Sequence, residues 1–397
     1  MKTMFKEEKL FIANIIKIFT ALRKTEIEVY EWDESVVRQG RLQNAPDFYK
    51  LTKKRANLTF SGWALAHSIV KADYLDKRNL TMPGLGFLLQ ANDLIDFSKS
   101  SIELKPRASE VLNDFSLTSL SGRVGQGIAI LYGHHLGLKF TSHLSSHVNS
   151  LHSTSSGIKH KKEKMADFLF ADTSNKTYLI ESKGTFTQTD NNPSKIKSVL
   201  KSALQNQVDP WMKRLNPLPS NGYVVYSCLR EGSWCPSSLS VVDPSNDNDE
   251  SAVVPFNPEQ VMRENYGTWL RVMGLPQAAK RLIRLPDTKS SENYEPIPTK
   301  TRFMTVKIGE REFALPYLPY IRFPHLPFDT LVVGIDLSVL MAISTVIESP
   351  DLQLSDLLIS ILPKEYEQKE TVSIFPDGSF LGMIHLRSYF KETIISI

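Results

Sequence analysis

The sequence has few cysteines and no long apolar run. Its 397 residues include two cysteines, Cys228 and Cys235, which are too few for a disulfide framework and too far apart for a C-x-x-C metal site. No apolar segment reaches the length of about 18 residues that a membrane-spanning helix needs. These absences favour a cytoplasmic protein that keeps its thiols reduced and has no membrane partner.

The sequence also lacks the short motifs of several enzyme classes. It contains no internal repeat, no P-loop, no G-x-G-x-x-G fingerprint and no H-E-x-x-H helix, so nothing in it supports these nucleotide-binding or zinc-protease sites. The formal net charge is +4, from 47 basic and 43 acidic residues. This small excess does not by itself indicate a polyanionic partner, and nucleic-acid binding has to be argued from where the lysines lie.

Segments rich in Pro, Gly, Ser and Asn divide the chain into four zones. Residues 1–115 are expected to be mostly helical, beginning with an amphipathic helix within residues 1–24. Residues 116–232 alternate helices and strands, as an α/β unit does. Residues 233–299 begin as a loop rich in Pro, Ser, Asn and Asp and continue as a helical pair. Residues 300–397 are expected to form a mixed α/β region of unknown role.

The last zone has clear local signals. A hairpin should turn at Gly309, and a buried strand, TLVVGI, should lead through Asp336 as N-cap into a helix. A second hairpin is expected around Asp377 and Gly378. None of these features indicates a catalytic or binding function.

The most informative stretch is ADFLFADTSNKTYLIESKGTF, residues 166–186. Two short apolar runs flank the polar segment ADTSNK, so they should pair as an antiparallel hairpin. Side chains two positions apart on a strand share a face, which puts Glu181 beside Lys183, and the pairing brings Asp167 to the same end. Two converging carboxylates repel each other unless a cation lies between them, and hard oxygen ligands suit Mg²⁺.

An acid-x-lysine triplet alone is a weak signal, because composition predicts roughly three by chance in a chain of this length. Four further triplets occur, at Glu7 and Lys9, Glu103 and Lys105, Asp287 and Lys289, and Glu367 and Lys369. The triplet at residues 181–183 differs from them in three ways. It lies on a strand-like run, an earlier run carries an aspartate at hairpin distance, and an amphipathic helix follows.

The pattern D-x13-E-x-K, with Asp167, Glu181 and Lys183, resembles the PD-(D/E)XK nuclease superfamily over residues 116–232. The resemblance implies a restriction-endonuclease-like α/β (α+β) core, in which helices flank a mixed central sheet. It implies Asp167 and Glu181 as ligands of Mg²⁺, which Mn²⁺ can replace, and the backbone carbonyl of Ser182 as a further ligand. Lys183 would assist the attacking water. Ala166 stands where the family name has proline.

The neighbouring helices supply further candidates. The helix before the hairpin lacks the glutamate that many family members carry there, so Gln126 is expected to hydrogen-bond a metal water or ligand, the alternative being an amide that faces solvent. Arg123, one turn away, could equally meet a phosphate or be solvated. In the helix after the hairpin, Lys201 and Gln205 are candidates for the site or the DNA backbone, and a solvated face is the alternative.

Local charge and histidine content also mark this zone. Residues 159–201 contain nine lysines against five acids, including Lys159, Lys161 and Lys162, and such a cluster can bind phosphates or simply face solvent. The histidine-rich stretch TSHLSSHVNSLHSTSSG, residues 141–157, is expected to be a flexible loop. Zinc binding there is the less favoured alternative, because no cysteine or H-x-E pattern accompanies it.

These observations favour a Mg²⁺-dependent nuclease that hydrolyses DNA, as an endonuclease of a bacterial restriction or anti-phage system. We expect it to act as a homo-oligomer or with a partner protein of that system. Two alternatives stay open: an RNA-cleaving nuclease of the same fold, and a nuclease-derived nucleic-acid-binding or scaffold module without catalysis.

Overall fold

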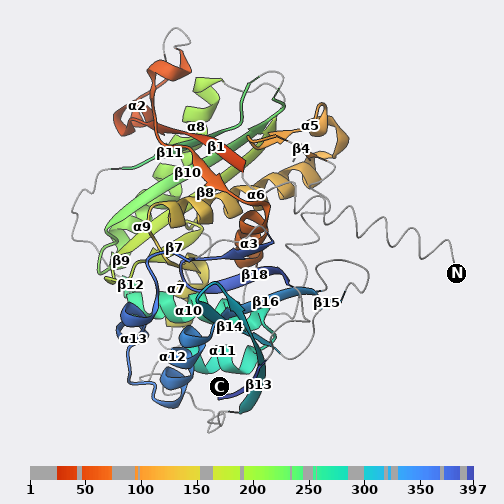
Figure 1. The fold of residues 1–397 in the computed structure, drawn as a ribbon. Coiled ribbons are helices and arrows are strands. Elements are labelled where there is room, and N and C mark those ends of the chain that lie inside the picture. Colours follow the sequence, from red (N-terminus) through yellow and green to blue (C-terminus); the bar gives the residue numbers. More distant parts are fainter. Residues whose placement is uncertain are drawn as a thin grey trace, which may run out of the picture.

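The computed structural model has mixed α/β architecture, with two large sheets and helices packed against them (Figure 1). It describes residues 25–42, 47–73, 94–96, 99–152, 164–187, 192–232, 235–244, 254–255, 257–284, 299–316, 321–322, 330–366, 371–384 and 391–397. The amphipathic helix expected within residues 1–24 lies outside this described part.

The first sheet is mixed and has the strand order β2-β1-β11-β10-β8-β7-β6, with β3 also paired to β1. Strands β6, β7 and β8 are antiparallel neighbours, whereas β8 pairs with β10, and β1 with β11, in parallel. The bounds are β1 Thr25–Trp32, β2 Thr52–Lys54, β3 Leu58–Phe60, β6 Phe140–His143, β7 Phe168–Ala171, β8 Thr177–Thr187, β10 Asn221–Arg230 and β11 Ser238–Val242.

Helices cover both faces of this sheet. On one face α6 (Asp114–His135) crosses β8 and packs beside α3 (Gly62–Asp73). On the other face α8 (Pro193–Ala203) buries Ile196 and Leu200 against Val224 of β10. A π turn, η2 (Leu204–Val208), continues α8 into α9 (Asp209–Arg214). The sheet is therefore shielded on both sides around β8 and β10.

The crossing of α6 and β8 depends on two glycines. A Cβ on Gly125 would lie 2.9 Å from the Cα of Gly184, and a Cβ on Gly184 would collide with the carbonyl oxygen of Ser121. The backbones of helix and strand thus touch directly, which only glycine permits. Close packing against β8 thus accounts for Gly125 of this helix.

The hairpin expected at residues 166–186 is confirmed. β7 and β8 pair from Phe168 with Ile180 to Ala171 with Thr177. Asp172 closes the turn by accepting the N–H groups of Ser174 at 2.8 Å and Lys176 at 2.9 Å. The polar residues between the two runs therefore form the turn, as their composition predicts.

Two interpretations of the sequence are wrong. Residues 238–242, expected within a loop, form the buried strand β11 between β10 and β1. Residues 140–152, in the histidine-rich stretch expected to be a loop, form β6 and the helix α7 (Leu144–His152). Strands of four and five residues contribute little to composition when polar residues surround them, and the serines and histidines of α7 hid its helical pattern in the same way.

The region expected to be mostly helical also contributes strands. β1 lies against β11, so the first sheet extends across the boundary proposed near residue 115. The remaining short elements of this half are α2 Glu34–Arg38, η1 Phe48–Lys50, β4 Ile95–Asp96, β5 Glu103–Leu104, α5 Ala108–Val111, β9 Leu215–Asn216 and β12 Val254–Pro255.

The second sheet is antiparallel in the order β17-β18-β16-β14-β13-β19, with β15 paired to β16. The hairpins at Gly309 and Gly378 are confirmed, and Asp336 caps α12 by accepting the Ser338 N–H at 2.9 Å. The helical pair is confirmed as well. The bounds are α10 Pro258–Val272, α11 Pro276–Ile283, β13 Lys300–Ile308, β14 Arg311–Pro316, β15 Ile321–Arg322, β16 Thr330–Asp336, α12 Leu337–Glu348, α13 Leu354–Ile361, β17 Val372–Ile374, β18 Ser379–Ile384 and β19 Lys391–Ser396.

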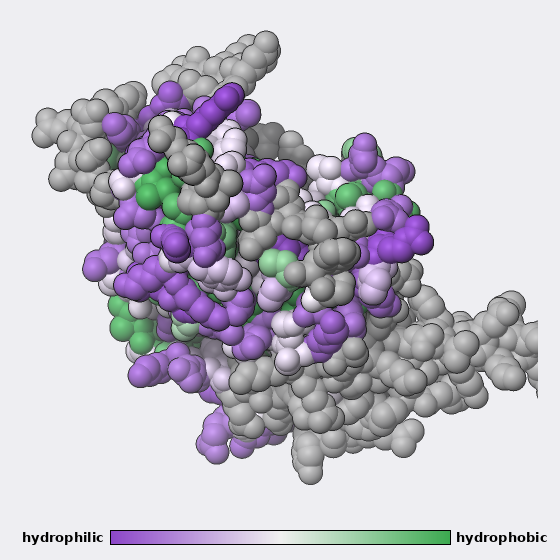
Figure 2. Space-filling model, turned by 90° about the horizontal axis from the view of Figure 1, so that it is seen from above, coloured by the Kyte–Doolittle hydropathy of each residue, from purple (hydrophilic) through white to green (hydrophobic). Residues whose placement is uncertain are grey.

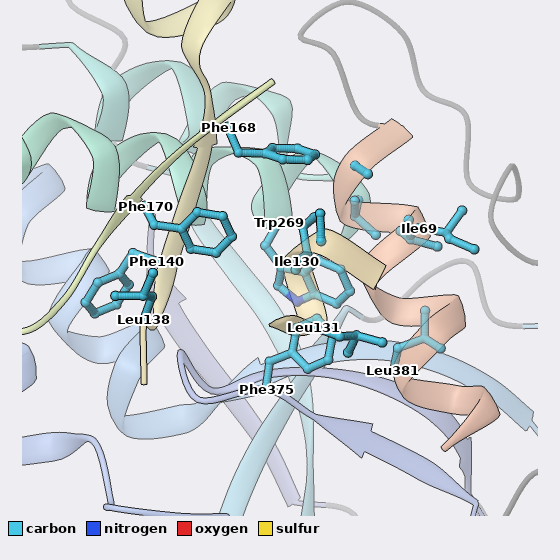
Figure 3. Close-up of a cluster of buried hydrophobic side chains, with 14 of the residues drawn as sticks. Ile69, Ile130, Leu131, Leu138, Phe140, Phe168, Phe170, Trp269, Phe375 and Leu381 are labelled. Atoms are coloured by element: carbon cyan, nitrogen blue, oxygen red, sulfur yellow. The ribbon is translucent and has the colours of Figure 1, made fainter. Parts of the chain in front are cut away.

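One apolar core joins the two sheets. Figure 3 shows Phe168 and Phe170 of β7 in the same cluster as Trp269 of α10 and Phe375. Trp269 also donates its Nε1 hydrogen to the carbonyl of Gly334 in the second sheet at 2.6 Å. The C-terminal region therefore shares its core with the strand that follows Asp167.

Candidate active site

The hairpin brings Asp167, Glu181 and Lys183 together, as the sequence predicts. Asp167 comes directly before β7, and the pairing of Phe168 with Ile180 sets it beside Glu181. Its N–H donates to Glu181 Oε2 at 3.1 Å, and Lys183 Nζ forms an ion pair with Glu181 Oε1. The roles of these residues stay a prediction, but their proximity is a feature of the fold.

Ser182 orients the carboxylate of Asp167. Both its N–H, at 3.0 Å, and its hydroxyl donate to Asp167 Oδ2. Hydrogen bonds to a charged acceptor are stronger than neutral ones, so they hold this carboxylate in one direction. The sequence analysis assigns Ser182 a ligand role through its carbonyl, whereas these contacts add a second task, which is to fix Asp167.

Glu181 is the most strongly perturbed member of the group. Its side chain is fully buried, and burial together with the nearby Asp167 raises its pKa to about 8, against the opposing effect of Lys183. At neutral pH most molecules therefore carry a proton on Glu181. A cation that entered between the two carboxylates would favour the charged form of both.

The donor set fits a lightly coordinated hard cation. Within the described residues no group of three or more His, Cys, Asp or Glu side chains could hold a metal ion. Mg²⁺ needs only one or two carboxylates, because it keeps several waters and takes phosphate oxygens as further ligands. Asp167 and Glu181 meet that requirement.

The two candidates on α6 lie on the other face of the sheet. Glu181 and Lys183 pair with Val224 and Tyr226 of β10, which pack toward α8, while α6 covers the opposite face. Within the described structure no hydrogen bond joins Gln126 to Asp167, Glu181 or Lys183. Its predicted link to a metal water therefore has no direct contact to support it and stays a prediction.

Arg123 is engaged by an acid that the sequence analysis did not consider. Its Nε lies 3.1 Å from both carboxylate oxygens of Asp73, the last residue of α3, and its Nη2 completes the ion pair. This contact ties α6 to α3. A phosphate contact by Arg123 stays a prediction, and it would have to coexist with Asp73.

The candidates on and after α8 take other positions. Lys201 Nζ donates to the carbonyl of Gln39 at 3.0 Å, and Lys197 binds the carbonyl of Gly40, so these lysines hold the segment after α2. Gln205 is exposed in η2. Lys159, Lys161 and Lys162 lie outside the described residues.

His143 belongs to the histidine-rich stretch, and the sequence did not predict that it would lie next to the Asp167 segment. This residue ends β6 opposite Phe168, and its neighbour Leu144 donates its N–H to the carbonyl of Asp167 at 3.1 Å. The signal was present in Phe140 and Thr141, which are strong strand formers. The surrounding serines and histidines hid it.

Comparison with known proteins identifies no relative of this chain. No family model, no curated protein and no solved structure matches the chain. In the part of the chain that the structure describes, no helix is both long and apolar enough to cross a bilayer.

Proposed function

We propose that this chain is a Mg²⁺-dependent nuclease that hydrolyses phosphodiester bonds of DNA, as an endonuclease of a bacterial restriction or anti-phage system. The observation that carries the proposal is the convergence of Asp167, Glu181 and Lys183 on one hairpin. Of the four other triplets, only the one at Glu103 and Lys105 lies within the described residues. There Glu103 pairs across β4 and β5 with Asp96, but Lys105 follows the end of β5, and Glu103 forms its ion pair with Lys99.

The topology around the hairpin supports the same proposal. Along the chain, α6 is followed by β6, by α7 and by the hairpin of β7 and β8, whose strands are antiparallel neighbours of one another and of β6. Then come α8, η2, α9, β9 and β10, which is parallel to β8. The helices α6 and α8 lie on opposite faces of these strands. This order resembles the restriction-endonuclease-like core, with Asp167 directly before β7 and with Glu181 and Lys183 on β8.

The side chains of the site would have different roles in the reaction. Bound Mg²⁺ would neutralise the two carboxylates and polarise the phosphate. Ser182 would keep the Asp167 carboxylate aimed at the cation, and Glu181 would release its proton on binding it. Lys183 is about one-third exposed, so its ammonium group can reach solvent, orient the attacking water and offset the negative charge that develops on the phosphate. The water oxygen would form a bond to phosphorus as one ester P–O bond breaks, and a proton from the water would pass to the leaving oxygen, which gives a phosphate monoester and a hydroxyl group.

The non-catalytic alternative fits less well. A module that only binds nucleic acid has no use for a lysine held beside two converging carboxylates. RNA remains the competing substrate, since none of the described contacts distinguishes a 2′-hydroxyl.

The test is a cleavage assay on plasmid, linear duplex DNA, single-stranded DNA and RNA with Mg²⁺, Mn²⁺ or EDTA. We expect the wild type to cut DNA only with a divalent cation, and Asp167→Ala and Lys183→Ala to lose at least about 100-fold in rate. Lys176→Ala is the matched control, because Lys176 lies exposed in the turn of the same hairpin and should cut normally.

Three outcomes would change the assignment. Cation-dependent cutting that persists in both site variants would place the chemistry elsewhere. Cutting of RNA alone would make this a ribonuclease. Binding of DNA without cutting by any form would favour the scaffold module.

A further inference from the structure

Two elements outside the hairpin meet next to Asp167. They are the end of β6, where His143 pairs with Phe168, and the end of α3, where Ala72 and Asp73 lie. Because Leu144 donates its N–H to the Asp167 carbonyl at 3.1 Å, a shift of β6 would move the backbone of Asp167.

The side chain of His143 bridges these two elements. Its Nε2 lies 2.8 Å from the carbonyl oxygen of Ala72 and must donate, because a carbonyl has no hydrogen to give. Its ring lies 5.0 Å from that of Phe168. Burial lowers the pKa of His143, while Asp167 and Asp73 oppose this, so both carboxylates act on the same ring.

A buried polar network fixes both partners of this bridge. Asn265 of α10 accepts hydrogen bonds from Lys71 Nζ on α3 at 2.9 Å and from the N–H of Thr141 on β6 at 3.1 Å. Lys71 also pairs with Asp377, and both of these side chains are almost completely buried. The last turn of α3 and strand β6 are thus held to one anchor, and His143 adds the link nearest to the site.

We propose that His143 is a positioning residue of the active site, which fixes the end of β6 against α3 and thereby sets Asp167 at the distance from Glu181 that a divalent cation needs. The inference rests on the proposed function, since it assumes that these two carboxylates bind a cation. It assigns His143 no contact with substrate. It also gives α3, which lies outside the hairpin and its flanking helices, a part in the geometry of the site.

The test measures Mn²⁺ binding in the absence of nucleic acid, from the loss of the free-ion EPR signal. His143→Ala should weaken binding about tenfold or more, as the loss of outer-sphere partners of metal ligands does. His143→Gln should restore most of the affinity, because its Nε2 can donate to Ala72. His135→Ala is the control, since His135 is exposed at the end of α6, and Asp167→Ala should abolish binding.

The outcomes separate this inference from the proposed function. Mn²⁺ binding by His143→Ala as tight as that of the wild type would overturn the role of His143 alone. Equal weakening in the Ala and Gln variants would also overturn it, because the bond to Ala72 would then not matter. A wild type without saturable Mn²⁺ binding would overturn the metal site itself. His143→Gln keeps the test valid if His143→Ala does not fold.

Discussion

At the scale of single residues, burial changes the acid–base behaviour of Glu181. In water a glutamate is charged at neutral pH, but the folded protein raises the pKa of Glu181 to about 8 because its carboxyl group is buried beside Asp167. The folded state therefore binds a proton that the unfolded chain has already released. Under the proposed function, a bound cation would take the place of that proton.

This raised pKa predicts a pH-dependent stability in the absence of divalent cations. The raised pKa contributes stability that is complete below the ordinary glutamate range, near pH 4.5, and that is lost as pH rises through about 8. Glu181→Gln, which never ionises, should not suffer this loss. In EDTA the Tm of the variant relative to wild type should be higher at pH 9 than at pH 6.

The control for this experiment is Glu312→Gln, at an exposed position on β14. Its Tm difference from wild type should be the same at both pH values. A difference for Glu181→Gln that is equally independent of pH would contradict the raised pKa.

Sequence reasoning succeeded at this scale where the chemistry lies on a local pattern. The proximity of Asp167, Glu181 and Lys183 could be predicted because one hairpin holds all three. The place of His143 beside Phe168 and the ion pair of Asp73 with Arg123 could not, because these contacts join elements that no local spacing rule connects. The hydroxyl of Ser182 was overlooked for another reason: the resemblance directs attention to its carbonyl.

At the scale of secondary structure, the contact between α6 and β8 is the tightest constraint near the site. Gly184 follows Lys183 directly, and a side chain there would meet the carbonyl oxygen of Ser121, which cannot move without unwinding the helix. Gly184→Ala should therefore destabilise the protein by at least about 1–3 kcal/mol, the usual cost of overpacking. Urea denaturation would measure it.

Gly122, on the same helix, provides the matched control. A Cβ on Gly122 meets nothing within 4 Å, so Gly122→Ala should be neutral or stabilise by up to about 1 kcal/mol through helix propensity. If the two variants were equally stable, α6 and β8 would have to lie farther apart than the structure has them.

Elements could be predicted from sequence wherever their signals are contiguous. The hairpins at Gly309 and Gly378 and the cap at Asp336 follow from a few adjacent residues each. β11 has its partners far away in the chain, since Val29 of β1 pairs with Leu239. A strand stabilised by such distant pairing shows little of it in its own five residues.

At the scale of the whole molecule, the two sheets share one apolar core. The sequence suggested separate zones, because linkers rich in Pro and Ser interrupt it. In the structure these zones are joined by one apolar core and by the buried network of Lys71, Asn265 and Asp377. Tertiary contacts of this kind leave no periodic pattern, so the union of the zones could not be predicted from the sequence.

The buried ion pair of Lys71 and Asp377 predicts a large effect on the free energy of unfolding. Lys71→Met would leave Asp377 charged and buried, which typically costs about 3–5 kcal/mol of the free energy of unfolding. Burial raises the pKa of Asp377, whereas Lys71 and its hydrogen bonds more than compensate and hold it below the ordinary range. Without Lys71 the effect of burial dominates, and Asp377 can take up a proton. Urea denaturation should therefore show a smaller deficit for Lys71→Met at pH 4.5 than at pH 7.5.

The pH dependence separates lost charge pairing from lost packing, because a cavity destabilises equally at both pH values. Lys54→Met removes the partner of Glu28 from a largely exposed pair and should cost less than about 1 kcal/mol. A deficit for Lys71→Met no larger than this would mean that the ion pair does not hold the C-terminal region to α3. A large deficit that disappears in acid would show that the region carrying Asp377 and the helix ending at Asp73 unfold as one unit, so that the candidate site depends on both.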